Sequence, residues 1–143
     1  MFVVDANVVF SALIKRGIAY KVFFLNFLLE KFRFIAPEYL WLEIRRHKEE
    51  ILEETKLSEE EFEEFFEFLM EEIEIVPDSK FLHVMPKAEE ILPEHKKDSP
   101  YLALALAMNC PIFSGDVNLK KQTVVKVYSP RELLDTLLGE ASL

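Results

Sequence analysis

Short apolar runs along this chain alternate with longer stretches of helical periodicity. The short runs are rich in β-branched and aromatic residues and predict strands at 2–4, 32–35, 73–76, 111–114 and 124–128. Apolar residues three and four positions apart predict helices at about 7–14, 18–31, 37–46, 58–73, 86–92, 98–108 and from 130 onward. Strands and helices that alternate in this way predict an α/β fold, with a mostly parallel central sheet covered by helices on both faces.

Two helix starts have a specific signature. Ser58 and Glu61 form one S-x-x-E capping box, and Ser129 and Glu132 form another with proline at the first helical position. An apolar stripe follows Ser58 along 62–73, with glutamates on the opposite face, and it consists of Phe62, Phe65, Phe66, Leu69, Met70 and Ile73. We interpret this stripe as core packing in preference to an interface for a partner protein.

The length of 143 residues is near that of one domain, so we expect 1–143 to form a single domain with an acidic helical segment at about 49–74. Half of the residues are apolar and there is one cysteine, which argues against disorder, a disulfide framework and a structural zinc site. No apolar stretch approaches the ~20 residues of a membrane helix. The first residues also lack a basic leader, and we therefore expect a cytoplasmic protein.

The net charge of −9 would by itself argue against binding to nucleic acid, but the charge is segregated. Residues 49–74 hold thirteen glutamates and one basic residue, Lys56, and so carry −12, which leaves +3 for the rest of the chain. Binding depends on the local field and not on the total charge. The acidic composition therefore does not exclude a nucleic-acid partner.

Four carboxylates stand in separate segments that could converge on one cleft. The predicted topology brings Asp5 and Asp116 to the same edge of the sheet, whereas the loop before Asp98 can come from either edge. Asp5 ends the first strand, Asp116 follows the 111–114 strand, Asp98 opens a helix, and Glu43 lies on the helix after the second strand. Clustered carboxylates raise one another's pKa values, and a hard divalent cation such as Mg²⁺ or Mn²⁺ relieves that repulsion. Taken singly, each acid also fits a plainer role, as a turn residue, a helix cap or a surface residue.

The only adjacent Lys/Arg pairs are distributed among the same four segments. They are candidate contacts for phosphate groups if the acids converge, and a solvated surface is the alternative for any one pair. The pairs are Lys15 and Arg16, Arg45 and Arg46, Lys96 and Lys97, and Lys120 and Lys121.

Four segments together resemble the motifs of the PIN domain family. They are Phe2-Val3-Val4-Asp5-Ala6-Asn7, Pro37-Glu38-Tyr39-Leu40-Trp41-Leu42-Glu43, Lys97-Asp98-Ser99-Pro100-Tyr101-Leu102-Ala103, and Pro111-Ile112-Phe113-Ser114-Gly115-Asp116. The order and spacing match from residue 1 to about 138. The ordered set is more specific than any single motif.

The resemblance implies an α/β/α sandwich on a parallel sheet, dependence on Mg²⁺ or Mn²⁺, and hydrolysis of RNA phosphodiester bonds. By motif position, Asp5, Glu43, Asp98 and Asp116 would be the catalytic metal ligands. Asn7 and Ser114 would orient carboxylates or water, and Asn118 stands where some members have a further acid. Many prokaryotic members are toxins paired with an antitoxin protein, and many form homodimers.

Three alternatives remain at this point. A haloacid-dehalogenase-like phosphatase needs an acid two residues after Asp5, where this chain has Asn7, and another acid where it has Lys120. A ribonuclease that uses histidine as acid and base is disfavoured because the three histidines are scattered. A catalytically silent PIN-fold module that binds RNA or serves as an adaptor is the third alternative, and the presence of all four acids argues against it.

Overall fold

The computed structural model describes residues 1–140 and residue 142, and a five-stranded parallel sheet forms its centre. The strands lie in the order β3-β2-β1-β4-β5, and every neighbouring pair is parallel. This arrangement confirms the predicted α/β fold with a parallel sheet. The strands are β1 (Phe2–Val4), β2 (Phe34–Pro37), β3 (Ile73–Val76), β4 (Ile112–Phe113) and β5 (Val127–Tyr128).

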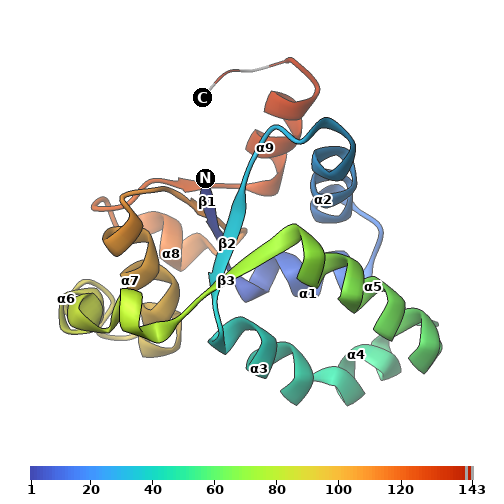
Figure 1. Ribbon diagram of the computed structural model, residues 1–143, viewed down its shortest axis with the longest axis horizontal. Helices are drawn as coiled ribbons and strands as arrows, with labels where there is room; N and C mark the ends of the chain where they lie inside the picture. Colours follow the sequence, from blue (N-terminus) through green and yellow to red (C-terminus); the bar gives the residue numbers. More distant parts are fainter. Residues whose placement is uncertain (141, 143) are drawn as a thin grey trace.

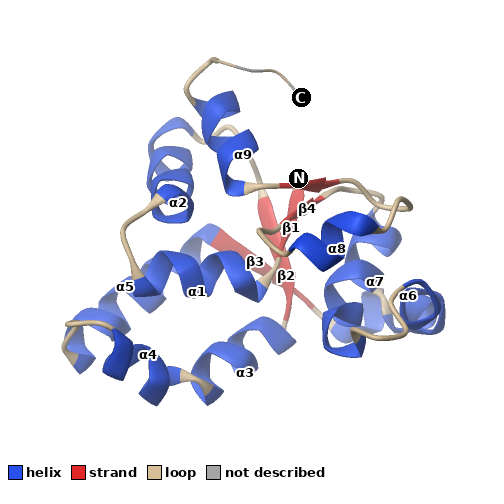
Figure 2. Cartoon of the chain, turned by 180° about the vertical axis from the view of Figure 1, so that it is seen from behind, coloured by secondary structure: helices blue, strands red, loops and turns tan. Residues whose placement is uncertain are grey.

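Helices connect the strands and cover both faces of the sheet. Figure 2 shows the sheet in red, with α1, α2 and α9 on one side and α6 and α7 on the other. The helices are α1 (Ala6–Ile14), α2 (Ile18–Leu29), α3 (Tyr39–Arg46), α4 (Lys48–Glu54), α5 (Glu59–Glu72), α6 (Met85–Ile91), α7 (Ser99–Met108), α8 (Val117–Lys121) and α9 (Pro130–Leu137). Three short 3₁₀ segments are η1 (Asp78–Lys80), η2 (Leu82–Val84) and η3 (Lys96–Asp98). The three layers are those of an α/β/α sandwich.

The core lies between the sheet and α7 on one face, and between the sheet and α1 and α2 on the other. α7 is apolar all round and buries Leu102 to Ala105, because it packs directly against β1, β2 and β4. On the opposite face, the rings of Phe23, Phe34 and Phe113 meet with centroids 5.5–5.7 Å apart. This packing fixes the central strands and therefore the residues that follow them.

Three predicted strands have different bounds in the structure, and β4 differs only in that it excludes the residues at positions 111 and 114. Phe32 lies outside β2 because its backbone N–H and C=O are both bound by the side chain of Asn26 at the end of α2. The strand instead runs to Pro37, which lies opposite Val76 in the register with β3. The last strand is shorter than expected because the side chain of Gln122 binds the backbone of residues 124–125 and folds them into a turn.

The acidic segment forms two helices that pack on the body of the protein (Figure 1). α4 contacts α1, and α5 contacts α2 and β3. Along the apolar stripe, Phe62, Phe66, Leu69 and Ile73 are buried, which confirms its interpretation as core packing, whereas Met70 is exposed. Both predicted capping boxes are present, at Ser58 and at Ser129. No helix in the described part of the chain is long and apolar enough to cross a membrane.

Candidate active site

Two of the four acids follow neighbouring strands at the centre of the sheet. β1 and β4 are paired, with Val4 opposite Phe113, so Asp5 and Asp116 emerge from the same carboxyl edge. The backbone N–H of Asp5 also donates to the C=O of Phe113 at 3.1 Å, which extends the pairing by one residue. Asp5 is only 3% exposed and Asp116 is half-buried.

Asp98 and Glu43 reach the same edge from the two helical layers. The last residue of α7 lies shortly before the first residue of β4, so the C-terminal end of α7 is near the amino end of that strand. Asp98, at the N-terminal end of α7, therefore lies beside the carboxyl ends of the strands. Asp98 stands at the N-cap position, yet among the described residues its side chain makes no capping hydrogen bond. Glu43 lies on α3, which begins directly after β2. The structure therefore does not support the interpretation of Asp98 as a helix cap. The residue is buried, with 7% of its surface exposed.

Ser114 joins two of the acids. Its hydroxyl donates to Oδ2 of Asp5 at 2.7 Å and accepts from the backbone N–H of Asp116 at 2.9 Å. Asn118 donates its backbone N–H to Oδ1 of Asp116 at 2.8 Å, so Asp116 also caps α8, as the turn-residue alternative expected. The exposed side chain of Asn118 takes no part in that bond.

Asn7 supports the turn that carries Asp116. Its Oδ1 accepts the backbone N–H of Gly115 at 2.8 Å. A Cβ atom at position 115 would lie 2.9 Å from the same oxygen, so the close approach requires glycine here. Asn7 therefore acts on the backbone of the turn, whereas Ser114 contacts a carboxylate directly.

The electrostatics show that the four acids share one environment. The pKa of Asp5 is raised from 3.8 to about 7, mainly by burial. The hydrogen bond from Ser114 lowers this pKa, and the charges of Asp98, Asp116 and Glu43 raise it. Burial also raises the pKa values of Glu43 and Asp98, and each of these groups is further raised by another acid of the set. Each of these three acids therefore lies near enough to at least one other acid of the set for its charge to affect the pKa.

Tyr101 is a site residue that the sequence analysis did not single out. Its hydroxyl donates to Oε1 of Glu43 at 2.5 Å, and the residue is 1% exposed. Burial, followed by the charge of Glu43, raises the pKa of Tyr101, so the phenol stays protonated and remains a donor. The sequence could have indicated this role, because Tyr101 stands three positions after Asp98 and so on the same face of the helix.

Comparison with known proteins agrees with this geometry. The model of the PIN domain family matches residues 3–136, which covers nearly the whole chain and all four acids. The chain belongs to the PIN domain family. No curated protein and no solved structure matches the sequence significantly. The PIN fold is a nuclease-type fold, and its members commonly use divalent metal ions.

The donor set of this PIN domain fits a hard divalent cation. Carboxylate oxygens are the ligands that Mg²⁺ and Mn²⁺ prefer. The raised pKa of Asp5 comes mainly from burial, with a further contribution from the neighbouring carboxylates. Across residues 1–140 and 142, however, no three His, Cys, Asp or Glu side chains are yet close enough to hold an ion. Three of the acids accept hydrogen bonds, from the hydroxyls of Ser114 and Tyr101 and from the backbone N–H of Asn118.

The eight basic residues are all exposed, and they differ in what they contact. Lys97 lies close enough to Glu43 and Asp98 to lower the pKa values of both. Lys120 and Lys121 line a hollow of ≈ 350 Å³ that also includes Asp116, and Lys120 pairs with Glu132 at its edge. Arg45 is turned toward α5, where it binds Glu63 and covers the ring of Phe66.

The other four basic residues lie elsewhere or have no hydrogen bond or ion pair within the described part of the chain, and Arg46, at the end of α3, is one of the latter. Arg16 covers the ring of Tyr20 and, with Lys15, lines a hollow between α1 and α5 that contains none of the four acids. Lys96 lies beside Lys97 on η3. Lys97 and the α8 pair are therefore the basic residues nearest the carboxylates, while Arg45 faces away from them.

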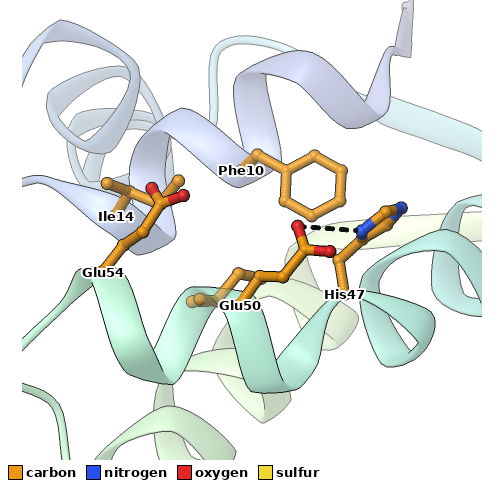
Figure 3. A pocket seen from close by; sticks show the side chains of 6 residues that line it. Phe10, Ile14, His47, Glu50 and Glu54 are labelled. Atoms are coloured by element: carbon orange, nitrogen blue, oxygen red, sulfur yellow. Dashed lines mark hydrogen bonds and ion pairs between the residues drawn. The ribbon is translucent and has the colours of Figure 1, made fainter.

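A separate pocket between α1 and α4 contains His47. Two histidines lie near the acids, since His47 lowers the pKa of Glu43 and His95 lowers the pKa of Asp98. Figure 3 shows Phe10 and Ile14 on one wall and Glu50 and Glu54 on the other. The ring of His47 packs edge-on against Phe10, and its Nδ1 lies 3.3 Å from Glu50. The pocket holds none of the four acids, so the ring of His47 packs beside the site and not within it.

Proposed function

We propose that this PIN domain is an endoribonuclease that hydrolyses RNA phosphodiester bonds with Mg²⁺ or Mn²⁺. The observation that carries the proposal is the convergence of Asp5, Glu43, Asp98 and Asp116, from four separate segments, at one edge of the sheet. Among enzymes that act on phosphodiesters, this donor set supports hydrolysis assisted by a metal ion better than histidine catalysis.

The chain's own residues perform the positioning. The four carboxylates would hold the cation, which supplies Lewis acidity to activate water and to neutralise charge on the phosphate. Ser114 fixes the orientation of Asp5 and the turn of Asp116, and Asn7 holds the same turn through Gly115. Because these side chains are already bound, they lose little conformational freedom when substrate enters.

The substrate phosphates would meet the basic residues beside the carboxylates. Lys97 adjoins Asp98 and Glu43, and Lys120 and Lys121 line the hollow next to Asp116. A phosphate held between these two groups would lie over the four acids. Contacts of this kind bind the backbone of a nucleic acid without reading the bases. The choice of RNA as the substrate is supported by the family, and no particular sequence is implied.

Cleavage of an RNA panel tests the proposal. We expect cleavage in Mn²⁺ or Mg²⁺, none in EDTA, and a loss of at least about a hundredfold in Asp5→Asn and Asp98→Asn. Asp78→Asn is the matched control, because Asp78 is an exposed aspartate outside the site. Binding of RNA without any cleavage by the wild-type protein would favour the catalytically silent module instead.

A surface between α2 and α5 supports a partner protein as a further part of the proposal. Phe24, Phe27 and Leu28 are exposed on α2, and Phe27 is 53% exposed. Beside them is an apolar hollow of ≈ 390 Å³, lined by aromatic residues of both helices and by Glu71 and Glu72. Exposed apolar patches of this kind mark interfaces, either with a second copy in a homodimer or with an antitoxin.

Size-exclusion chromatography with light scattering measures that interface. Phe27→Glu should convert a dimer to a monomer or prevent capture of a co-expressed partner, while RNA cleavage stays unchanged. A monomeric wild-type protein that binds no protein from its own cell would argue against both the homodimer and the toxin role. The expectation of a cytoplasmic protein stays a prediction.

A further inference from the structure

We propose that Tyr101 makes Glu43 a one-oxygen ligand and thereby sets the preference of the site for Mg²⁺ and Mn²⁺ over Ca²⁺. The inference rests on the proposed function, because it assumes that the four carboxylates hold a cation. It assigns to Tyr101 a positioning role, since its hydroxyl contacts Glu43 and not the reacting atoms.

The contact between Tyr101 and Glu43 is held from both sides. Tyr101 is fully buried in α7, and its ring lies against the ring of Tyr39 with centroids 6.2 Å apart. Buried rings in a packed core keep one rotamer, so the hydroxyl has a fixed position. Glu43 approaches it from α3, and the hydrogen bond of 2.5 Å selects Oε1. The second oxygen, Oε2, accepts no hydrogen bond from the residues that the structure describes.

The same pattern recurs at two other acids of the site. Ser114 donates to Oδ2 of Asp5, and the backbone N–H of Asn118 donates to Oδ1 of Asp116. Three of the four carboxylates therefore have one oxygen engaged by the protein and one oxygen remaining. The arrangement offers single oxygens from several carboxylates and disfavours chelation by both oxygens of one carboxylate.

This supply of single oxygens distinguishes between cations. Mg²⁺ takes six ligands in near-octahedral geometry and binds carboxylates through one oxygen, whereas Ca²⁺ takes six to eight ligands and often uses both oxygens of a glutamate. A phenol proton on Oε1 competes with the second bond to Ca²⁺. It leaves the first bond, through Oε2, available to Mg²⁺ or Mn²⁺.

Titration calorimetry of the full-length protein tests the idea with Mn²⁺, Mg²⁺ and Ca²⁺ as the probes. In Tyr101→Phe, which keeps the ring, we expect the ratio of Mn²⁺ to Ca²⁺ affinity to fall by roughly tenfold, the effect of about one hydrogen bond to a charged group. Tyr20→Phe is the matched control, because Tyr20 lies outside the site, and it should keep the wild-type ratio. An unchanged or increased ratio in Tyr101→Phe would overturn the inference.

A second pair of variants separates this role from a structural one. When Glu43→Gln removes the charged ligand, adding Tyr101→Phe should no longer change the ratio of Mn²⁺ to Ca²⁺ affinity. A further change of similar size in that background would mean that Tyr101 acts through another group, and it would contradict the proposal.

A crystal soaked in Mn²⁺ provides a test that needs no variant. We expect Oε2 of Glu43 at the ion and Oε1 still bonded to Tyr101, and a Glu43 bound to the ion through both oxygens would contradict the inference. If the wild-type protein binds no divalent cation and cleaves no RNA, the proposed function fails together with the inference. If it binds Mn²⁺ and cleaves RNA while Tyr101→Phe keeps the wild-type ratio, the inference alone fails.

Discussion

Asp5→Asn should stabilise the protein when no divalent cation is present. Asp5 is almost completely buried, and its pKa is raised from 3.8 to about 7, mainly by burial and then by the three neighbouring acids. The folded state therefore resists the charge that Asp5 carries above pH 7. Asparagine has nearly the same shape, carries no charge and keeps an oxygen that accepts the hydrogen bond of Ser114.

The magnitude follows from the linkage between protonation and folding. A pKa raised by about three units corresponds to about 4 kcal/mol of lost stability once the pH exceeds the folded-state value. Relaxation of the side chain and entry of water reduce the penalty. We therefore expect Asp5→Asn to increase the free energy of unfolding by roughly 2–4 kcal/mol at pH 8 in EDTA.

The sign and the pH window are specific. Because the folded-state pKa is raised, the stabilising effect of neutral Asp5 is complete below about pH 4 and is lost as the pH rises through 7. The difference between the variant and the wild-type protein should therefore be near zero at pH 4 and largest at pH 8. Urea unfolding followed by circular dichroism measures it, with Asp78→Asn as the control. A destabilised Asp5→Asn protein in EDTA at pH 8 would refute the reasoning.

Four other changes have defined outcomes. Mn²⁺ affinity measured by calorimetry should increase as the pH rises through about 7, because Asp5 loses its proton there, and a pH-independent affinity would disagree. Gly115→Ala should push Asn7 away from the turn and lower the free energy of unfolding by about 1 kcal/mol. The same variant should bind Mn²⁺ more weakly, and unaltered binding would mean that the turn does not position Asp116. Lys97→Met should raise KM for RNA and weaken the salt dependence of binding, whereas an unchanged KM would exclude a phosphate contact. Ser129→Ala should lower the melting temperature through loss of a capping box worth about 1 kcal/mol, with Mn²⁺ affinity unchanged.

The order of the strands and the meeting of Asp5 and Asp116 at one edge of the sheet were predictable from the sequence, whereas α8 was not predicted. Strand and helix periods differ, and parallel strands bring their carboxyl ends to one edge, so Asp5 and Asp116 could be placed together from pattern alone. The capping boxes at Ser58 and Ser129 were likewise local signals that the structure confirms. Glu43 and Asp98 could be assigned to the site only through the family motifs, because a position on a helix does not determine which residues the side chain contacts.

The remaining features depend on side chains that are far apart in the sequence or that replace backbone pairing. The hydrogen bond between Tyr101 and Glu43 spans 58 positions, and no local pattern indicates it. The side chain of Gln122 shortened the last strand by binding the backbone that a neighbouring strand would have paired with. Arg45 was a candidate contact for phosphate. In the structure its side chain binds Glu63 and covers the ring of Phe66, both on α5.

The central claim is that four separate carboxylates hold one catalytic cation together, and Mn²⁺ titration of single variants tests it most directly. The account predicts that the wild-type protein binds Mn²⁺ and that Asp5→Asn, Glu43→Gln, Asp98→Asn and Asp116→Asn each weaken that binding by tenfold or more, on the order of one lost charged contact. Asp78→Asn should bind as the wild-type protein does. Equal Mn²⁺ affinity in the wild-type protein and all four variants would contradict the account.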